Sequence, residues 1–452
     1  MSDAFDLIVL GSGSAGSTPA YKCRAAGWRV AVADDQPFGG TCANRGCDPK
    51  KVLVGAADLV AWHKRMHGHG IVGDASIDWP ALVEFKRSFT DPVPPRTEAA
   101  FMHEGIELFH GEARFVAEDR LLIDGREVTA RHVLIATGAS PRRLDIPGES
   151  LIATSTDFLA LSALPRRIAF IGAGYVSLEF AHLARRAGAE VVVLSRGTSL
   201  TIFDEALVDR LFAFSRDIGI DIRLGAPVKA VERDSASSAL RVHAGDGASA
   251  YVVEADLVVH GAGRVPNTAR LGAEKGHIDL DEHGAVRVNE FLQSTSNPRV
   301  YAAGDVVRAP DSLPLTPVAS HEGAVVAANL LNGNSERPDF RGTPSVVYTI
   351  PALASVGLTE KAAREKGMRV RVQSADTTGW YTNRRVREPV GMFKIVFDAD
   401  TDRVVGAHLL GAVSEEVINI FALAIRFGIT AAELRKMIFA YPTGGSDVAH
   451  FV

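Results

Sequence analysis

The chain has 452 residues, so the usual size of a domain predicts about two to four domains rather than one continuous core. Its composition, with 46% hydrophobic and 23% charged residues, excludes wholesale disorder. The net charge of −5, without any run of basic residues, argues against nucleic acid and anionic membranes as partners. The acidic start of the chain and the lack of an apolar stretch of about 20 residues predict a cytoplasmic protein that does not span a membrane.

The first predicted structure is a βαβ unit near the start of the chain. An apolar strand at residues 7–10 leads into a Gly-x-Gly-x-x-Gly turn at residues 11–16, a helix follows, and a second strand at residues 30–33 ends at Asp34. In that context the glycines allow the backbone to approach a pyrophosphate at the helix N-terminus. Asp34 can accept hydrogen bonds from a ribose hydroxyl, so the unit predicts a dinucleotide site rather than a purely structural turn.

Only three cysteines are present, which excludes a disulfide framework and leaves packing, metal binding or redox chemistry as their roles. Cys23 is predicted to be a buried packing residue, whereas Cys42 and Cys47 lie five positions apart in a segment with several glycines. A metal site is not predicted, because zinc needs four ligands and no further cysteines or nearby histidine cluster are present. A bond between the two thiols requires a distorted turn, which Gly46 and Pro49 allow, and a strained short loop suits a bond that is opened and remade.

A second βαβ unit begins with a strand at residues 168–171. A Gly-rich turn at residues 172–177, a helix and a strand at residues 191–194 follow. The second strand is followed by Ser195 and Arg196 rather than by an acid, and an arginine there can bind a 2′-phosphate through charge-assisted hydrogen bonds. NADPH is therefore favoured over NADH. The alternative is that Arg196 is only a solvated surface cation.

The remaining pattern predicts further strands and a separate domain at the end of the chain. Three prolines at residues 92–95 predict a break in a helical region, and apolar strands that end at glycine or Gly-Asp are predicted at residues 133–138, 257–263 and 300–305. After residue 344 the pattern changes to that of an α+β domain. Its short strands and amphipathic helices are predicted at residues 345–349, 391–397, 403–410, 415–427 and 431–437.

Four motifs occur in the same order as in one known enzyme family. They are Gly-Gly-Thr-Cys-x4-Cys-x-Pro-x-Lys at residues 39–51, Ala-Thr-Gly at 136–138, Gly-Arg-x-Pro-Asn at 263–267 and Ala-Ala-Gly-Asp at 302–305. Together with the two βαβ units, they resemble the class I pyridine nucleotide-disulfide oxidoreductases, which include glutathione reductase, dihydrolipoamide dehydrogenase and mercuric reductase. The resemblance covers essentially the whole chain, and the cysteine motif is its most specific part.

The resemblance implies an enzyme that uses FAD and NADPH, with NADH less favoured. FAD would bind the first βαβ unit, with Asp305 on its ribityl and flavin side, and NADPH would bind the second. Cys47 would be the charge-transfer thiolate beside the flavin, and Cys42 the interchange thiol that meets the acceptor. Lys51, paired with Glu179, would lie near the flavin N5, because a cation stabilises reduced flavin and an acid holds that cation in place.

The resemblance also implies the remaining site residues. Tyr175 resembles an aromatic gate over the nicotinamide pocket, although an ordinary packed tyrosine is the alternative. The predicted catalytic residues are Cys42, Cys47, Lys51, Glu179 and Tyr441. The predicted cofactor-binding residues are Gly11, Gly13, Ser14, Gly16, Asp34, Gly40, Thr41, Lys51, Thr137, Gly138, Gly172, Gly174, Tyr175, Val176, Glu179, Ser195, Arg196, Gly263, Arg264, Gly304 and Asp305.

The chain departs from the family at two places that concern the electron acceptor. Thiol-disulfide members end in a His-Pro-Thr-x-x-Glu motif, and here Tyr441 stands in place of the His and Ser446 in place of the Glu. A phenol is a poor base at neutral pH, although it can donate a hydrogen bond. Tyr21 and Lys22 stand where glutathione reductases tend to carry two arginines. A small disulfide-type acceptor is the leading hypothesis, and metal ions, quinones or a slow redox-sensing role are the alternatives.

The predicted fold class is α/β, with two Rossmann-like dinucleotide-binding domains and a C-terminal α+β dimerisation domain. The FAD domain is predicted at residues 1–150 and 271–340, the NAD(P)H domain at 151–270, and the dimerisation domain at 341–452. The protein is predicted to be a homodimer in which the partner's C-terminal segment completes each site. Its other partner would be a small-molecule electron acceptor.

Overall fold

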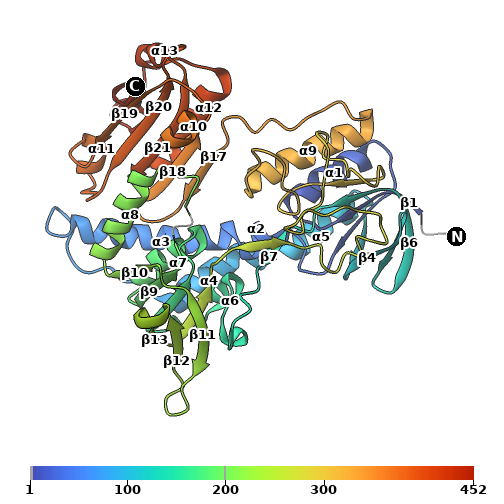
Figure 1. Cartoon of the computed structure of the whole chain (residues 1–452), viewed down its shortest axis with the longest axis horizontal. Helices are drawn as coiled ribbons and strands as arrows, with labels where there is room; N and C mark the ends of the chain where they lie inside the picture. The colour runs from blue at the N-terminus through green and yellow to red at the C-terminus, as the bar shows by residue number, and fades with distance from the viewer. Residues whose placement is uncertain (1–3, 198–199) are drawn as a thin grey trace. The chain divides into compact units, whose positions relative to one another are not determined.

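The computed structural model describes residues 4–197 and 200–452 (Figure 1). These residues form two compact units, each built from three separate stretches of the chain. The first unit contains the described residues up to Lys50 with Phe85–Arg142 and Gly263–Phe340, and the second contains Lys51–Glu84, Arg143–Ala262 and Arg341–Val452. Part of the acidic start of the chain, residues 1–3, lies outside the described residues.

A mostly parallel sheet forms the centre of the first unit. Its strand order is β3-β2-β1-β6-β5-β4, and β16 pairs in parallel with the last residues of β6. The antiparallel β4 and β5 continue the sheet beside the first residues of β6. The strands are β1 (Ala4–Leu10), β2 (Val30–Asp34), β3 (Glu107–His110), β4 (Ala113–Ala117), β5 (Arg120–Ile123), β6 (Arg126–Ile135) and β16 (Val300–Ala302), and a separate pair is formed by β7 (Ala139–Pro141) and β15 (Arg264–Pro266).

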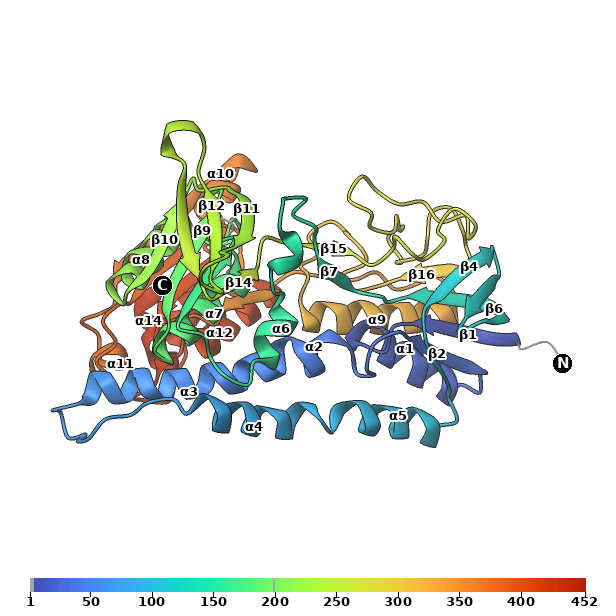
Figure 2. The same ribbon diagram turned by 90° about the horizontal axis from the view of Figure 1, so that it is seen from below.

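Both faces of this sheet are covered, which explains why β1 is an almost continuous apolar run. Leu7 and Val9 belong to one core and Ile8 and Leu10 to the other, and all four side chains are buried. Helices α1 (Ser14–Ala25) and α9 (Thr316–Asn332) pack side by side against the Leu7 face (Figure 2). A strand that is buried on both faces is typical of a parallel sheet with helices packed on it.

The second unit contains a parallel sheet, a small antiparallel sheet and a larger antiparallel sheet. Their orders are β10-β9-β8-β14, β11-β12-β13 and β17-β18-β21-β20-β19. The strands of the first two are β8 (Arg167–Ile171), β9 (Glu190–Ser195), β10 (Ile220–Leu224), β14 (Leu257–His260), β11 (Val228–Arg233), β12 (Leu240–Ala244) and β13 (Tyr251–Ala255). Those of the third are β17 (Pro344–Val347), β18 (Ala352–Gly357), β19 (Val370–Asp376), β20 (Met392–Asp398) and β21 (Val404–Gly411).

The remaining helices connect and cover these sheets. They are α2 (Gly40–Arg45), α3 (Cys47–Met66), α4 (Trp79–Thr90), α5 (Val93–His103), α6 (Ser155–Ala160), α7 (Tyr175–Arg186), α8 (Glu205–Asp217), α10 (Glu360–Glu365), α11 (Tyr381–Arg384), α12 (Ser414–Phe427), α13 (Ala431–Lys436) and α14 (Val448–Phe451), with short 3₁₀ turns η1 (Glu149–Leu151), η2 (Gly247–Ser249) and η3 (Gly444–Asp447). Within the described ranges, no helix combines the length and apolar character needed to cross a bilayer.

The predicted α/β fold class is confirmed, with both βαβ units present as parallel strands joined by α1 and α7. The predicted helix break is confirmed too, since α4 ends at Thr90 and α5 begins at Val93. The sequence analysis did not predict the strands β3 to β5, β7, β10 to β13, β15, β18 and β19. The predicted domain boundaries stay a prediction. The chain passes from one compact unit to the other after Lys50, Glu84, Arg142, Ala262 and Phe340, and only the last of these positions is also a predicted boundary.

A buried ion pair in the second unit joins the last turn of α3 to the segment after α11. Arg65 Nη1 lies 2.9 Å from Glu388 Oε2, and the two side chains are 12% and 2% exposed. Arg65 Nη2 and Glu388 Oε1 have no hydrogen-bond partner among the described residues. Burial raises the pKa of Glu388 to about 7, although the guanidinium groups of Arg65 and Arg186 act in the opposite direction. The arginine therefore compensates the buried carboxylate only in part.

Candidate active site

Predicted cofactor-binding residues of the first unit follow the ends of its parallel strands. Gly11 follows β1, Asp34 ends β2, Thr137 comes shortly after β6, and Gly304 shortly after β16. Because the carboxyl ends of parallel strands share one edge of a sheet, these positions lie along the same edge. Ligands of open α/β sheets bind in the crevice at this edge, so the arrangement favours a dinucleotide site there.

Asp34 holds the Gly-rich turn to the cysteine segment through Ser12, a residue that the sequence analysis did not single out. The Asp34 carboxylate accepts hydrogen bonds from the backbone N–H of Ser12 at 2.8 Å and from its hydroxyl at 2.6 Å. The same hydroxyl accepts a hydrogen bond from the backbone N–H of Gly39 at 2.9 Å. The Asp34 carboxylate therefore fixes the turn besides being a candidate ribose ligand.

Two glycines allow the cysteine segment to approach its neighbours closely. At Gly40 the backbone is left-handed, with φ of +73°, and a Cβ there would lie 2.4 Å from Gly13 Cα. Gly46 separates α2 from α3, and its Cβ would lie 2.8 Å from the carbonyl oxygen of Thr41 and 3.1 Å from Cys42 Cα. Any side chain at these positions would clash with backbone atoms. The distorted turn predicted between the two cysteines is therefore present at Gly46.

Cys42 lies in α2 and Cys47 begins α3, and the structure does not join them by a disulfide. A hydrogen bond to Cys47, burial, and the charges of Cys47 and Asp48 raise the pKa of the Cys42 thiol well above its usual range, whereas a hydrogen bond from Thr316 lowers it. Cys42 Sγ donates to Asp48 Oδ1 at 3.9 Å, and Cys47 Sγ lies 3.7 Å from Thr316 Oγ1. The two predicted redox cysteines are therefore brought together.

Thr316 and Asp48 were missed by the sequence analysis. Thr316 is the first residue of α9 and is followed by proline, which is common at the start of a helix. Nothing near Thr316 in the sequence connects it with Cys47, which precedes it by 269 positions. Asp48 lies inside the cysteine motif, where a charged residue beside a redox thiol was a local signal that could have been used.

Lys51 and Glu179, which the family resemblance predicted to be paired, form an ion pair within the second unit. Lys51 Nζ lies 3.2 Å from Glu179 Oε2, and the Glu179 side chain is 1% exposed. Glu179 Oε1 accepts a hydrogen bond from the backbone N–H of Tyr348 at 2.8 Å. The ammonium group also lies 3.8 Å from the centroid of the Tyr348 ring, a cation–π contact. Tyr348 is thus a neighbour of the pair that sequence reasoning missed.

The residues around β16 fit the ribityl and flavin side of FAD. Asp305 follows β16, burial raises its pKa, the guanidinium of Arg264 lowers it, and its carboxylate has no hydrogen bond to any described residue. Glu322 holds the backbone beside it, accepting from the N–H of Gly304 at 2.6 Å. The Asp305 carboxylate is half-buried and can accept hydrogen bonds from the hydroxyl groups of a polyol chain.

The second Gly-rich turn lies between β8 and α7, as predicted. Gly174 is the N-cap of α7, Gly172 follows β8, and Tyr175 and Val176 are the first residues of the helix. At the end of β9 the Ser195 hydroxyl donates to the carbonyl oxygen of Gly197 at 2.6 Å. The Arg196 side chain is exposed and forms no ion pair with the described residues, so its guanidinium is available to a ligand.

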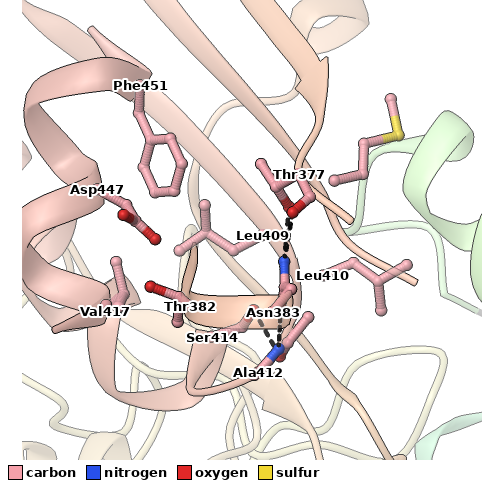
Figure 3. Close-up of a pocket in the computed structure, with 13 residues that line it drawn as sticks. Thr377, Thr382, Asn383, Leu409, Leu410, Ala412, Ser414, Val417, Asp447 and Phe451 are labelled. Atoms are coloured by element: carbon pink, nitrogen blue, oxygen red, sulfur yellow. Dashed lines mark hydrogen bonds between the residues drawn. The ribbon is translucent and has the colours of Figure 1, made fainter. Parts of the chain in front are cut away.

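The C-terminal motif is laid out differently from a His-Glu pair. The Tyr441 side chain is 82% exposed within its own chain. Ser446 closes a capping box with Thr443, with its hydroxyl donating to the Thr443 carbonyl oxygen at 2.6 Å. A small pocket is lined by residues of β20, β21, α11, α12, η3 and α14, including Asp447, and by none of the predicted site residues (Figure 3). Tyr441 therefore has no orienting partner at the Ser446 position.

The chain is similar to known proteins over nearly its whole length. Residues 5–323 match the family described as pyridine nucleotide-disulphide oxidoreductase, and residues 343–450 match the dimerisation domain of that family. The chain is 36% identical over 441 residues to a glutathione reductase of Burkholderia cepacia, covering 97% of this chain and 96% of that protein. It is 32% identical over 444 residues to a mercuric reductase of Staphylococcus aureus, covering 97% and 80%. Among solved structures, the Cu(II) complex of the HOCl-induced flavoprotein disulfide reductase RclA from Escherichia coli is similar, with 28% identity, coverage of 99% and 98%, and a TM-score of 0.88.

Proposed function

The chain belongs to the pyridine nucleotide-disulphide oxidoreductase family, and we propose that it uses NADPH to reduce a small disulfide-type acceptor through Cys42 and Cys47. It is an oxidoreductase whose cofactors are FAD and a pyridine nucleotide. The observation that carries the proposal is the pair of adjacent thiols at the break between α2 and α3. A panel of disulfides, quinones and metal ions, assayed by NADPH oxidation, tests it.

Bound FAD would take a hydride from the nicotinamide and supply an electron pair to the Cys42–Cys47 disulfide. With the S–S bond broken, Cys47 is a thiolate and Cys42 carries a proton. After losing that proton, Cys42 attacks a sulfur of the acceptor, forms a mixed disulfide and expels one thiol. Cys47 then attacks Cys42 Sγ, remakes the S–S bond and expels the second half of the acceptor as a thiolate, which takes a proton from solvent. The acceptor has then gained two electrons and two protons.

The proton of the interchange thiol has no histidine to receive it at position 441. We expect Tyr441→Phe to lower kcat by about 10- to 1000-fold, the range for losing one positioned proton donor. The rate should also rise with pH in both proteins, because the pKa of Cys42 is raised and its thiolate is the attacking form. A pH profile of turnover checks both points. A silent Tyr441→Phe with fast turnover at pH 7 would show that another group moves the proton.

Nucleotide choice is expected to depend on Arg196. The wild type should have a higher kcat/KM for NADPH than for NADH, and Arg196→Ala should lose most of that preference, a change of about 1–3 kcal/mol for a charge-assisted contact. Arg233→Ala, which removes an arginine at the end of β11 in the same unit, is the control. Steady-state kinetics with both nucleotides measure the ratio. Equal use of NADPH and NADH by the wild type contradicts the assignment.

A second candidate function is reduction of metal ions. It is favoured by the tyrosine at position 441, because a metal ion needs no proton on a leaving thiol. The relatives include a mercuric reductase, and one similar structure is a Cu(II) complex. Turnover with metal ions but not with disulfides in the acceptor panel would select this function.

The dimerisation domain supports a homodimer, and we propose that the Tyr441 segment of the partner completes each site. Several apolar side chains in and after α12 and α13 are exposed in the single chain, as expected for a surface that another copy covers: Leu423, Phe427, Met437 and Ile438. A cytoplasmic location stays a prediction. Sedimentation at twice the mass of the chain is the expected result, and a fully active monomer would contradict the shared site.

A further inference from the structure

A carboxylate lies beside the sulfur that the proposed mechanism exposes to the acceptor. Asp48 Oδ1 is 3.9 Å from Cys42 Sγ, and Asp48 is exposed in the first turn of α3. A hydrogen bond to Cys47 and burial are the main causes that raise the pKa of the Cys42 thiol, and the charges of Cys47 and Asp48 act in the same direction. The charge of Asp48 therefore acts directly at this sulfur.

Attack on an acceptor requires close approach to Cys42 Sγ. Reacting atoms come within about 3–3.5 Å of each other, so a charge near the reacting sulfur of the acceptor is also brought within several ångströms of Asp48. Across about 5 Å in a water-like dielectric, one pair of unit charges changes a rate by about three- to fivefold. Because the Asp48 side chain is exposed, this water-like value is the appropriate one.

The carboxylate acts on the acceptor by its charge and not as a base. In general a carboxylate is a far weaker base than a thiolate, so its main effect on a neighbouring sulfur is electrostatic. A negative group beside the thiol also raises its pKa, which lowers reactivity toward every acceptor alike. What differs between acceptors is only their own charge.

We propose that Asp48 selects the electron acceptor by charge, favouring neutral and cationic acceptors over anionic ones. The inference rests on the proposed function in one respect, namely that Cys42 is the thiol that meets the acceptor. It adds a specificity-determining residue and a substrate class. Disulfides flanked by carboxylates would be poor substrates, and disulfides flanked by amines, or metal cations, better ones.

The test measures the reactivity of Cys42 itself, without turnover. Holoenzyme with its cysteines reduced is treated with methanethiosulfonates that carry an ammonium group or a sulfonate. Every protein in this test carries Cys47→Ser, because Cys47 would otherwise resolve the mixed disulfide, and wild type here refers to position 48. The Cys42 thiolate displaces sulfinate and forms a mixed disulfide, and mass spectrometry of the Cys42 peptide gives each rate. Asp48→Asn keeps the shape of the side chain and removes the charge. Asp124→Asn, at the hairpin between β5 and β6, is the control. It removes one charge at an exposed position where the backbone is left-handed, a conformation that asparagine tolerates.

We expect Asp48→Asn to lower the ratio of cation to anion rates by about 10-fold, because attraction and repulsion are both lost. Asp124→Asn should leave the ratio unchanged. In the wild type, raising the ionic strength from about 0.01 M to 1 M should also lower the ratio, since salt screens an exposed charge. An unchanged ratio in Asp48→Asn, or a wild-type ratio that ignores salt, overturns the proposal.

Turnover is measured in parallel with a diamine disulfide and a dicarboxylate disulfide of similar size. Faster turnover of the diamine, with the preference lost in Asp48→Asn, supports the proposal. If the enzyme reduces neither disulfide while the thiol reagents still show the charge effect, the proposed function fails and the charge selection stands. If both disulfides are reduced equally fast and the reagent ratio is unaffected by Asp48→Asn, the charge selection alone is wrong.

Discussion

Cys47→Ser should lower NADPH-dependent reduction of any disulfide acceptor by at least about 10³-fold, because the mixed disulfide on Cys42 then has no thiolate to resolve it. Cys42→Ser should be equally inactive, since no thiol remains to attack the acceptor. The two variants differ in their spectra. Cys42→Ser keeps the Cys47 thiolate and should show long-wavelength charge-transfer absorbance with bound FAD, and Cys47→Ser should not.

Cys23→Ala provides the control for these variants. Cys23 is fully buried in the core between the sheet and α1, and burial raises its pKa to about 12, so it is not a reactive thiol. We expect wild-type turnover and an unchanged spectrum, with a small loss of stability. Stopped-flow absorbance and steady-state assays measure all three variants. Turnover near the wild-type rate in either Cys42→Ser or Cys47→Ser would remove the disulfide from the electron route.

Arg65→Met should lower the free energy of unfolding by about 3 kcal/mol near pH 8, because it leaves the carboxylate of Glu388 buried without its cation. The loss should be smaller at pH 5. In the folded protein burial raises the pKa of Glu388 to about 7, so folding favours the protonated acid. The stability from this group is present below the unfolded pKa near 4.5 and is lost as pH rises through about 7.

Removing Arg65 takes away a group that lowers the pKa of Glu388. The free energy of unfolding of the variant therefore continues to fall at higher pH, and its difference from the wild type increases. Glu388→Gln should make the free energy of unfolding less dependent on pH between about pH 5 and 8. Added to Arg65→Met, it should recover part of the lost stability, since no buried carboxylate remains. Urea unfolding at the two pH values measures each difference. A loss that is equal at pH 5 and pH 8 would show that Glu388 is not the titrating group.

The parts of the fold that the sequence predicts are those with a local signal. The strand at residues 7–10 is an apolar run that stops at a glycine turn, and the helix break at residues 92–95 follows from prolines, so neither depends on distant residues. Strand β18 was missed because its run of small residues, Ala352–Gly357, lacks the alternation of apolar and polar side chains that marks a strand. It is held in place by β17 and β21 on either side.

The residues of the candidate site also fall into those with a local sequence signal and those without one. Cys42 and Cys47 are five positions apart, and their chemistry could be argued from spacing and glycine alone. The partner of Lys51 is 128 positions away and was named only through the family resemblance, and Tyr348, which contacts both members of that pair, had no signal at all. Contacts across such distances are created by the packing of elements whose local sequences are independent of one another.

Strand β16 has a consequence for synthesis of the chain. The last residues of β6, Val133 to Ile135, are paired on one side by β1, and their other side is paired only by β16. The 164 residues between the end of β6 at Ile135 and the start of β16 at Val300 take about 10–30 s to be made at about 5–20 residues per second. During that time the nascent chain carries an apolar strand with an open edge, which is a template for pairing between chains. Yield of folded protein should therefore depend on translation speed and on chaperones, separately from the stability of the finished molecule.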